Sequence, residues 1–282
     1  MKIGFYTSTF NDRPAEEVFD FAKTAGFDAI EIDVGGHIKT PENVAAVAAK
    51  ARDRGLYVSS ITLFGNQLEP DATKRQELHA RTTAFAKAIE AANVPLFVIF
   101  PGRNNSISDD DNYQDFADHL NGLLAATPGG KLQFAIENWP GPHDDFVATT
   151  TDGWRRLLAL IPDKRFGLEF DPSHLIRLGI DPHAAFEQVK GRVKILHGKD
   201  TRIDAAQLQA VGYHGKGWWR YVLPGRGQLD WAKFLNQAKA AGFDDIISIE
   251  HEDGDFGWPG KDLDARYEGE RQGLAFLRKM LG

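Results

Sequence analysis

The stretch that decides the fold is AEEVFDFAKTAGFDAIEIDV, residues 15–34. Its first half, Ala15–Ala25, carries apolar residues at helical spacing, and Gly26 follows where a helix commonly ends in a left-handed residue. Its second half contains Ala29–Val34, a run of apolar and β-branched residues that is typical of a strand. The stretch therefore predicts a helix that passes through a glycine turn into a strand.

This helix–turn–strand arrangement recurs along the whole chain. The joint KTAGFD at Lys23–Asp28 is nearly repeated as KAAGFD at Lys239–Asp244. We interpret the repeat as the same turn used twice to connect a helix to the next strand. Strands are predicted at Lys2–Tyr6, Ala29–Val34, Tyr57–Phe64, Leu96–Phe100, Leu132–Glu137, Phe166–Phe170, Val193–His197 and Asp245–Glu250. Helices are predicted at Ala15–Ala25, Pro41–Arg54, Thr73–Ala92, Asp110–Ala126, Thr150–Ile161, Pro182–Val189, Asp230–Ala240 and Leu263–Met280.

Eight strand-then-helix units in 282 residues fit a closed (β/α)8 barrel, the TIM-barrel fold, which typically takes about 250 residues. The alternative is a doubly wound open sheet, which normally has a glycine-rich turn after its first strand. Thr7–Phe10 follows the first predicted strand without a glycine. Because no linker or change of composition divides the chain, we predict one α/β TIM-barrel domain spanning residues 1–282.

Composition excludes several classes of protein. The 33 basic and 40 acidic residues give a net charge of −7, which disfavours a nucleic-acid partner. No stretch approaches the roughly 20 apolar residues that cross a bilayer, and Asp12 comes too early for a secretory leader. We therefore expect a cytoplasmic protein with no membrane partner. The chain has no cysteine, so any metal ion must be held by carboxylates and imidazoles.

Acidic and imidazole side chains follow four of the later strands, at the end where a barrel carries its active site. Period-two alternation places Glu137, Asp171 and Glu250 on the face opposite the bulky apolar residues, and therefore in the lumen. His197 joins them from the strand between. Carboxylates this close repel one another unless a cation lies between them. A salt bridge to a lumenal Lys or Arg is the alternative for any single acid, but it does not explain all four strand ends.

The predicted ligands are Glu137, Asp171, His197 and Glu250. Three carboxylates with one imidazole favour a hard or borderline divalent ion over a closed structural zinc site. We therefore expect Mn²⁺ as the cofactor, with Mg²⁺ and Co²⁺ as alternatives.

Five short motifs at these strand ends resemble those of the xylose-isomerase-like TIM barrels, the superfamily of sugar and sugar phosphate isomerases and epimerases. In order they are Glu137–Asn138, Asp171–His174, His197–Asp200, Pro224–Trp231 and Ile249–Asp253. The resemblance covers essentially the whole chain and implies the same four metal ligands. It also implies that Glu137 and Glu250 form a general acid/base pair, and that His174 and Lys199 line the substrate site.

The chemistry that the resemblance implies is proton transfer next to a carbonyl group. A metal ion that chelates a carbonyl and the adjacent hydroxyl oxygen acidifies the C–H bond between them and stabilises the resulting enediolate. We expect an isomerase or epimerase acting on a ketose, keto-sugar or polyol-derived carbohydrate. Loss of a β-hydroxyl or alkoxide would instead make it a lyase or dehydratase on keto-sugars or keto-inositols, including a deglycosylating elimination.

Substrate recognition departs from that of the ketose 3-epimerases in this superfamily. Those enzymes usually carry a second glutamate six residues after the first ligand, where this chain has His143. Their arginine after the histidine ligand is also displaced by one position, to Arg202. We therefore expect His143 to contact a substrate that differs from theirs.

Other predicted substrate contacts are Asn138, Trp139, Phe64 and Arg220. Arg220 lies in Thr201–Gln228, the longest stretch predicted to be irregular, and a long loop in a compact domain is usually functional. Aromatic residues there suit the C–H faces of a sugar, but packing or a subunit contact explains them equally well. A dimer or tetramer is expected by analogy alone.

Two further classes stay open as alternatives. A multi-zinc phosphodiesterase would need several more lumenal histidines and a basic surface, for which the sequence gives no sign. A non-catalytic sugar-binding barrel would be favoured if Glu137 or Glu250 were salt-bridged and bound no metal.

Overall fold

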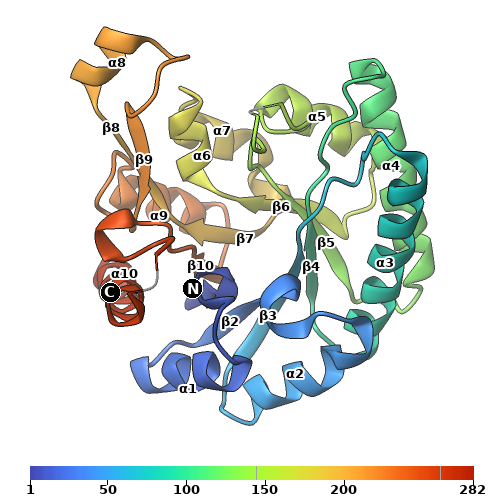
Figure 1. The fold of residues 1–282 in the computed structure, drawn as a ribbon, viewed down its shortest axis with the longest axis horizontal. Helices are drawn as coiled ribbons and strands as arrows, with labels where there is room; N and C mark the ends of the chain where they lie inside the picture. Colours follow the sequence, from blue (N-terminus) through green and yellow to red (C-terminus); the bar gives the residue numbers. More distant parts are fainter. Residues whose placement is uncertain (144, 261) are drawn as a thin grey trace.

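Eight parallel strands close into a barrel in the computed structural model, which describes residues 1–143, 145–260 and 262–282 (Figure 1). Around the barrel the strands follow the order β1-β10-β7-β6-β5-β4-β3-β2. They are β1 Lys2–Tyr6, β2 Ala29–Asp33, β3 Tyr57–Leu63, β4 Leu96–Ile99, β5 Gln133–Glu137, β6 Phe166–Phe170, β7 Val193–Gly198 and β10 Ile246–Ile249. Each begins and ends within one residue of its predicted position, so the TIM-barrel prediction is confirmed.

Helices surround the barrel (Figure 1). They are α1 Ala15–Ala25, α2 Val44–Arg52, α3 Ala72–Ala91, α4 Asp109–Ala126, α5 Thr151–Leu160, α6 Pro172–Arg177, α7 Pro182–Val189, α9 Trp231–Ala240 and α10 Leu263–Leu281. Short 3₁₀ or π turns lie at Thr7–Phe10, Val34–Ile38, Pro41–Asn43, Lys190–Arg192 and Gly254–Phe256. None of the helices in the described ranges is both long and apolar enough to span a membrane.

The two nearly identical joints have the geometry that their sequence predicts. Gly26 after α1 and Gly242 after α9 have φ values of +91° and +81°, in the left-handed region that glycine adopts without strain. The Gly26 N–H donates to the carbonyls of Ala22 and Lys23, which ends the helix. The chain then enters β2 two residues after Phe27, which is buried.

The core lies between the outer faces of the strands and the helices. Phe170 of β6 is fully buried there, with its ring 5.9 Å from Trp154, 5.5 Å from Phe186 and 5.8 Å from Phe234. A second, smaller cluster consists of Ala29, Leu96, Val98, Ala135, Ile195 and Ile246. These residues belong to the barrel strands. The polar residues of the site lie at the C-terminal ends of the strands.

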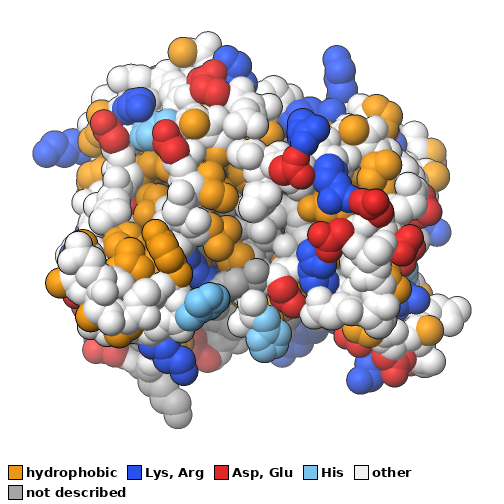
Figure 2. All heavy atoms as spheres, turned by 90° about the horizontal axis from the view of Figure 1, so that it is seen from above, with side chains coloured by type: hydrophobic (Ala, Val, Ile, Leu, Met, Phe, Trp, Pro, Cys, Tyr) orange, Lys and Arg blue, Asp and Glu red, His pale blue; other side chains and the backbone are white. Residues whose placement is uncertain are grey.

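The segment predicted to be irregular, Thr201–Gln228, is instead an ordered arm, and this prediction was wrong. Strands β8 Asp200–Ile203 and β9 Trp219–Val222 pair antiparallel, with α8 Ala205–Val211 between them. The strands are only four residues long, too short for their pattern to show in the sequence. Figure 1 shows the arm projecting from the barrel, and hydrophobic side chains gather on that side of the molecule in Figure 2.

A half-buried histidine pair between α3 and α4 predicts a pH dependence of stability. The rings of His79 and His119 stack with centroids 3.6 Å apart. Burial, together with the charge of His79, lowers the pKa of His119 from 6.5 to about 3. Because the unfolded chain takes up this proton at higher pH than the folded chain does, the free energy of unfolding should decrease as the pH falls from about 6.5 toward 3.

At pH 5 the contribution of His119 to this loss is roughly 2 kcal/mol relative to neutral pH. His119→Gln should therefore lose less stability than the wild type between pH 7 and pH 5, measured by urea unfolding. His214→Gln replaces an exposed histidine and should keep the wild-type slope. An unchanged slope in His119→Gln would contradict the prediction.

Candidate metal centre and active-site cavity

The structure brings the four predicted ligands together at the C-terminal strand ends. Glu137 ends β5, Asp171 follows β6, His197 lies in β7 and Glu250 follows β10, and all four are buried. Each offers one donor atom, and these four atoms lie within 4.8 Å of one another. His197 Nδ1 is 3.2 Å from both Glu137 Oε1 and Glu250 Oε2. The geometry is that of a cluster that can hold one cation.

Ionisation of the cluster follows from its internal contacts. Burial disfavours the charged form of Glu137, but hydrogen bonds from His174 and His197 outweigh it and lower its pKa to about 2. Burial also opposes ionisation of Asp171, yet Lys199 and His174 lower the pKa of that carboxyl well below its usual value. Both carboxylates are therefore ionised at neutral pH, the form in which they bind a metal ion.

The donor set fits a divalent ion. Asp171 Oδ2 is buried and lies 3.1 Å from Lys199 Nζ and 3.7 Å from His197 Nδ1. Three buried carboxylates around one imidazole repel one another, and a cation bound between them offsets that repulsion. Three carboxylates and one imidazole suit Mn²⁺, Mg²⁺ or Co²⁺.

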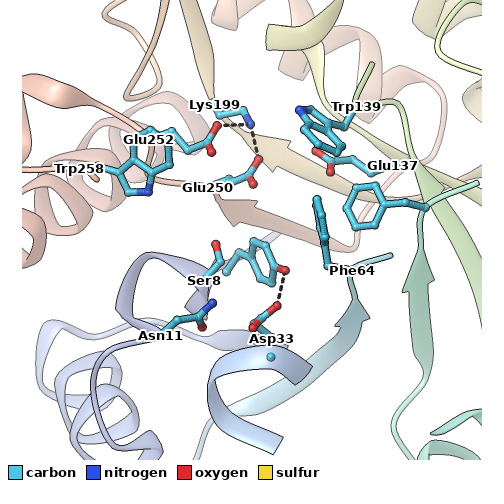
Figure 3. A pocket seen from close by; sticks show the side chains of 13 residues that line it. Ser8, Asn11, Asp33, Phe64, Glu137, Trp139, Lys199, Glu250, Glu252 and Trp258 are labelled. Atoms are coloured by element: carbon cyan, nitrogen blue, oxygen red, sulfur yellow. Dashed lines mark hydrogen bonds and ion pairs between the residues drawn. The ribbon is translucent and has the colours of Figure 1, made fainter. Parts of the chain in front are cut away.

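Lys199 lies beside the cluster, as its predicted role requires. Its ammonium group is 3.1 Å from Asp171 Oδ2 and 3.0 Å from Glu252 Oε2, and it also donates to Glu250 (Figure 3). Burial favours the neutral amine, but the charges of Asp171 and Glu250 outweigh it and raise the pKa of Lys199 well above its usual value. Lys199 is therefore a fixed positive charge at the wall of the site.

His174 connects the cluster to the arm. Its Nε2 is 3.1 Å from Glu137 Oε1, and its Nδ1 is 2.7 Å from the Tyr221 hydroxyl on β9. Arg177 of α6 donates to the same hydroxyl at 3.0 Å. Tyr221 was not predicted as a site residue, because nothing in the sequence shows that β9 folds back toward α6.

A cavity of about 450 Å³ lies at these strand ends. Figure 3 shows Lys199, Glu250 and Glu252 on one side of it and Glu137, Trp139 and Phe64 on the other. The ring of Phe64 is 5.2 Å from that of Trp139. The lining residues are Tyr6, Ser8, Asn11, Asp33, Gly35, Phe64, Phe100, Glu137, Trp139, Lys199, Glu250, Glu252 and Trp258. Five predicted site residues are among them: Phe64, Glu137, Trp139, Lys199 and Glu250.

Sequence reasoning missed the polar wall that follows β1 and β2. Asp33 accepts a hydrogen bond from the Tyr6 hydroxyl at 2.9 Å, and Ser8 and Asn11 line the cavity beside it. Nothing in the sequence shows this wall, although Gly36 leaves room for Asn11 in it. A Cβ there would lie 2.0 Å from Asn11 Oδ1, so only glycine permits this close approach.

Besides His174, which contacts the cluster, three predicted substrate contacts do not line the cavity. Asn138 is fully buried and hydrogen-bonded to the backbone of Asp171. The Arg220 guanidinium forms two 2.7 Å hydrogen bonds with the Asp255 carboxylate at the surface. His143 is exposed in the turns after β5. None of the three is among the described residues that line the cavity, so the structure adds no support for their contact with substrate.

The position of Asn138 predicts a structural role instead. Its Nδ2 donates to the Asp171 carbonyl at 2.9 Å, and its Oδ1 accepts from the Asp171 N–H at 2.8 Å. Asn138→Ala would leave both buried backbone groups without partners and should lower the free energy of unfolding by about 3 kcal/mol. Asn105→Ala, which removes an exposed hydrogen bond to Asp145, is the matched control for urea unfolding. A loss of less than about 1 kcal/mol in Asn138→Ala would contradict this role.

Two known proteins are similar to this chain in sequence. Bacillus subtilis (strain 168) uncharacterized protein YfiH is 24% identical over 298 residues, which cover 90% of this chain and 93% of that protein. Inosose dehydratase of Lacticaseibacillus casei is 32% identical over 114 residues, covering 38% of this chain and 37% of the relative.

The fold has a close counterpart among solved structures. D-psicose 3-epimerase from Clostridium cellulolyticum H10, solved with D-tagatose, superposes with a TM-score of 0.75 over 100% of this chain and 99% of that chain, at 15% identity. Residues 19–280 match the family described as Xylose isomerase-like TIM barrel. The resemblance seen in the strand-end motifs is thus confirmed, and this chain belongs to the Xylose isomerase-like TIM barrel family.

Proposed function

We propose that the protein is a divalent-metal-dependent isomerase or epimerase that acts through an enediolate on a ketose or keto-sugar. The observation that carries this proposal is the position of Glu137 and Glu250. Both belong to the four-residue cluster and both line the cavity, where Figure 3 shows them on opposite sides. A substrate carbon between them would therefore have one carboxylate on each face.

The residues of the chain divide the chemistry among them. When bound, a divalent ion that chelates a carbonyl and the adjacent hydroxyl oxygen acidifies the C–H bond between them and stabilises the enediolate. Glu137, held ionised by His174 and His197, takes the proton from one face. Glu250 in its protonated form gives a proton to the opposite face in epimerisation, or to the neighbouring carbon in isomerisation, and the two carboxyl groups then regain their starting forms by proton exchange with water.

The cavity walls suit a polyhydroxylated substrate. Phe64 and Trp139 form an aromatic wall for the C–H face of a sugar, and 57% of the surface of Phe64 is exposed. Ser8 and Asn11 offer hydroxyl and amide groups on another wall. Lys199 can donate to a substrate oxygen next to the ion. Mn²⁺ is the ion that we propose for the cluster.

The second candidate is a lyase or dehydratase that uses the same site. The local similarity to inosose dehydratase, 32% identical over 114 residues, favours it. The first proton transfer is the same in both reactions. They differ in whether the enediolate is protonated or instead expels a β-substituent.

Proton exchange in D₂O tests the proposal. Metal-free protein would be mixed with ketoses, keto-sugars and keto-inositols, before and after addition of Mn²⁺, and followed by NMR. We expect metal-dependent exchange at a carbon next to a carbonyl, and the product then separates epimerase, isomerase and lyase. No exchange on any of these substrates with Mn²⁺, Mg²⁺ or Co²⁺ would contradict the proposed function.

A further inference from the structure

Two further carboxylates lie deeper in the lumen, on the other side of the His197 ring. Glu31 of β2 places Oε2 at 3.3 Å from His197 Nε2, and Glu169 of β6 places Oε1 at 3.1 Å from the same nitrogen. All three side chains are fully buried. The imidazole thus lies between two sets of acidic residues. Its Nδ1 faces the metal cluster, and its Nε2 faces Glu31 and Glu169.

Contacts around Glu31 fix its orientation. Thr62 of β3 donates to Glu31 Oε1 at 2.6 Å, so the other carboxylate oxygen, Oε2, is directed at His197. The Tyr6 ring stacks on the imidazole with centroids 6.2 Å apart and an interplanar angle of 23°. Contacts within the protein therefore hold both the ring plane and the carboxylate in place.

We propose that Glu31 is a positioning residue for the metal site, which accepts the Nε2–H of His197 and so keeps Nδ1 free to bind the ion. A neutral imidazole carries one proton, and the partner of one nitrogen decides which nitrogen is left as a ligand. With the proton on Nδ1 instead, an N–H would point into the cation position, and the Nε2 lone pair would face two carboxylates. Glu31 and Glu169 thus select the binding tautomer.

A second ion between Glu31, Glu169 and His197 is the competing explanation for this group, because the three donor atoms are close enough to bind one. It would require His197 to lose its remaining proton and bind through both nitrogens. Oε1 of Glu31 is moreover already engaged by Thr62. The hydrogen-bonded arrangement needs neither change, so one ion per chain is expected.

Calorimetry of the metal-free protein tests this role without any substrate. We expect Glu31→Leu to weaken Mn²⁺ binding by roughly 10- to 100-fold. Glu31→Gln should recover part of that loss, because its carboxamide oxygen can still accept the Nε2–H. In Co²⁺-substituted protein the visible absorption band should shift in Glu31→Leu, since the donor strength of the imidazole changes. Glu270→Gln, which alters an equally buried glutamate on α10, should bind Mn²⁺ like the wild type.

Thr62→Val provides a second test should Glu31→Leu not fold. It keeps the shape of the side chain but removes the hydroxyl group that holds Glu31, and should weaken Mn²⁺ binding by about threefold to tenfold. The positioning role would be overturned if folded Glu31→Leu and Thr62→Val both bound Mn²⁺ like the wild type, or if the wild type bound two ions per chain. This inference rests on the metal site of the proposed function. A wild type that bound no ion would overturn both, whereas normal binding without proton exchange would contradict the reaction alone.

Discussion

Glu250→Gln is expected to lower the rate of metal-dependent proton exchange by roughly ten-thousand-fold, the upper range for loss of a general acid or base. The substitution keeps the shape of the side chain but removes its charge and its capacity to carry a proton. Because Glu250 also belongs to the metal cluster, elemental analysis should find less bound ion in the variant. Both losses act on the same step, so the variant should be inactive within the limits of NMR detection.

Asp255→Asn is the control for this experiment. Asp255 is an acidic residue of the same strand-end segment, but its carboxylate binds Arg220 at the surface. Its replacement should leave proton exchange and metal content unchanged. If Glu250→Gln kept more than about a hundredth of the wild-type rate, Glu250 would not be the acid or base of the reaction.

Lys199→Met is expected to lower the free energy of unfolding of the metal-free protein by about 3–5 kcal/mol. The ammonium group lies within 3.1 Å of Asp171 and Glu252 and donates to Glu250, with only 1% of its side chain exposed. Without it, the buried carboxylates of Asp171 and Glu250 and the half-buried carboxylate of Glu252 lose the ammonium group that they share. Methionine fills a similar volume, so the loss would come mainly from charge rather than from packing.

Saturating Mn²⁺ should restore much of this stability, because the ion replaces part of the missing positive charge. Thermal or urea unfolding with and without Mn²⁺ measures both effects, and the stabilisation by metal should be larger in Lys199→Met than in the wild type. Lys194→Met is the control, since Lys194 lies on β7, the strand that leads to Lys199, and donates to the Lys164 carbonyl at the surface. Equal losses in the two variants would contradict the role of Lys199.

The sequence predicted what depends on local periodicity. Each barrel strand was placed within one residue, because strand alternation and left-handed turns such as Gly26 are local properties. The faces of β5 and β10 were predicted for the same reason, and so was the convergence of Glu137 and Glu250. In a closed barrel, knowing the face of each strand is enough to place side chains in a common lumen.

What the sequence did not predict depends on contacts across the barrel or outside it. Glu31 is one acidic residue in an alternating strand, and its partner His197 comes 166 positions later in the chain. Tyr221 reaches His174 only because β9 folds back over the barrel. The sequence also does not show that the Arg220 guanidinium pairs with Asp255.

The base of the arm is closed by one carboxylate. Asp200 accepts hydrogen bonds from the backbone N–H groups of Thr201, at 2.8 Å, and of Gln228 and Leu229, at 3.0 and 3.1 Å. It also accepts one from the Trp231 indole at 3.0 Å. The inserted segment therefore leaves and re-enters the barrel at a single point, which makes it an exchangeable module. Grafting a different arm onto this base would change what reaches the active site while the barrel strands keep their register.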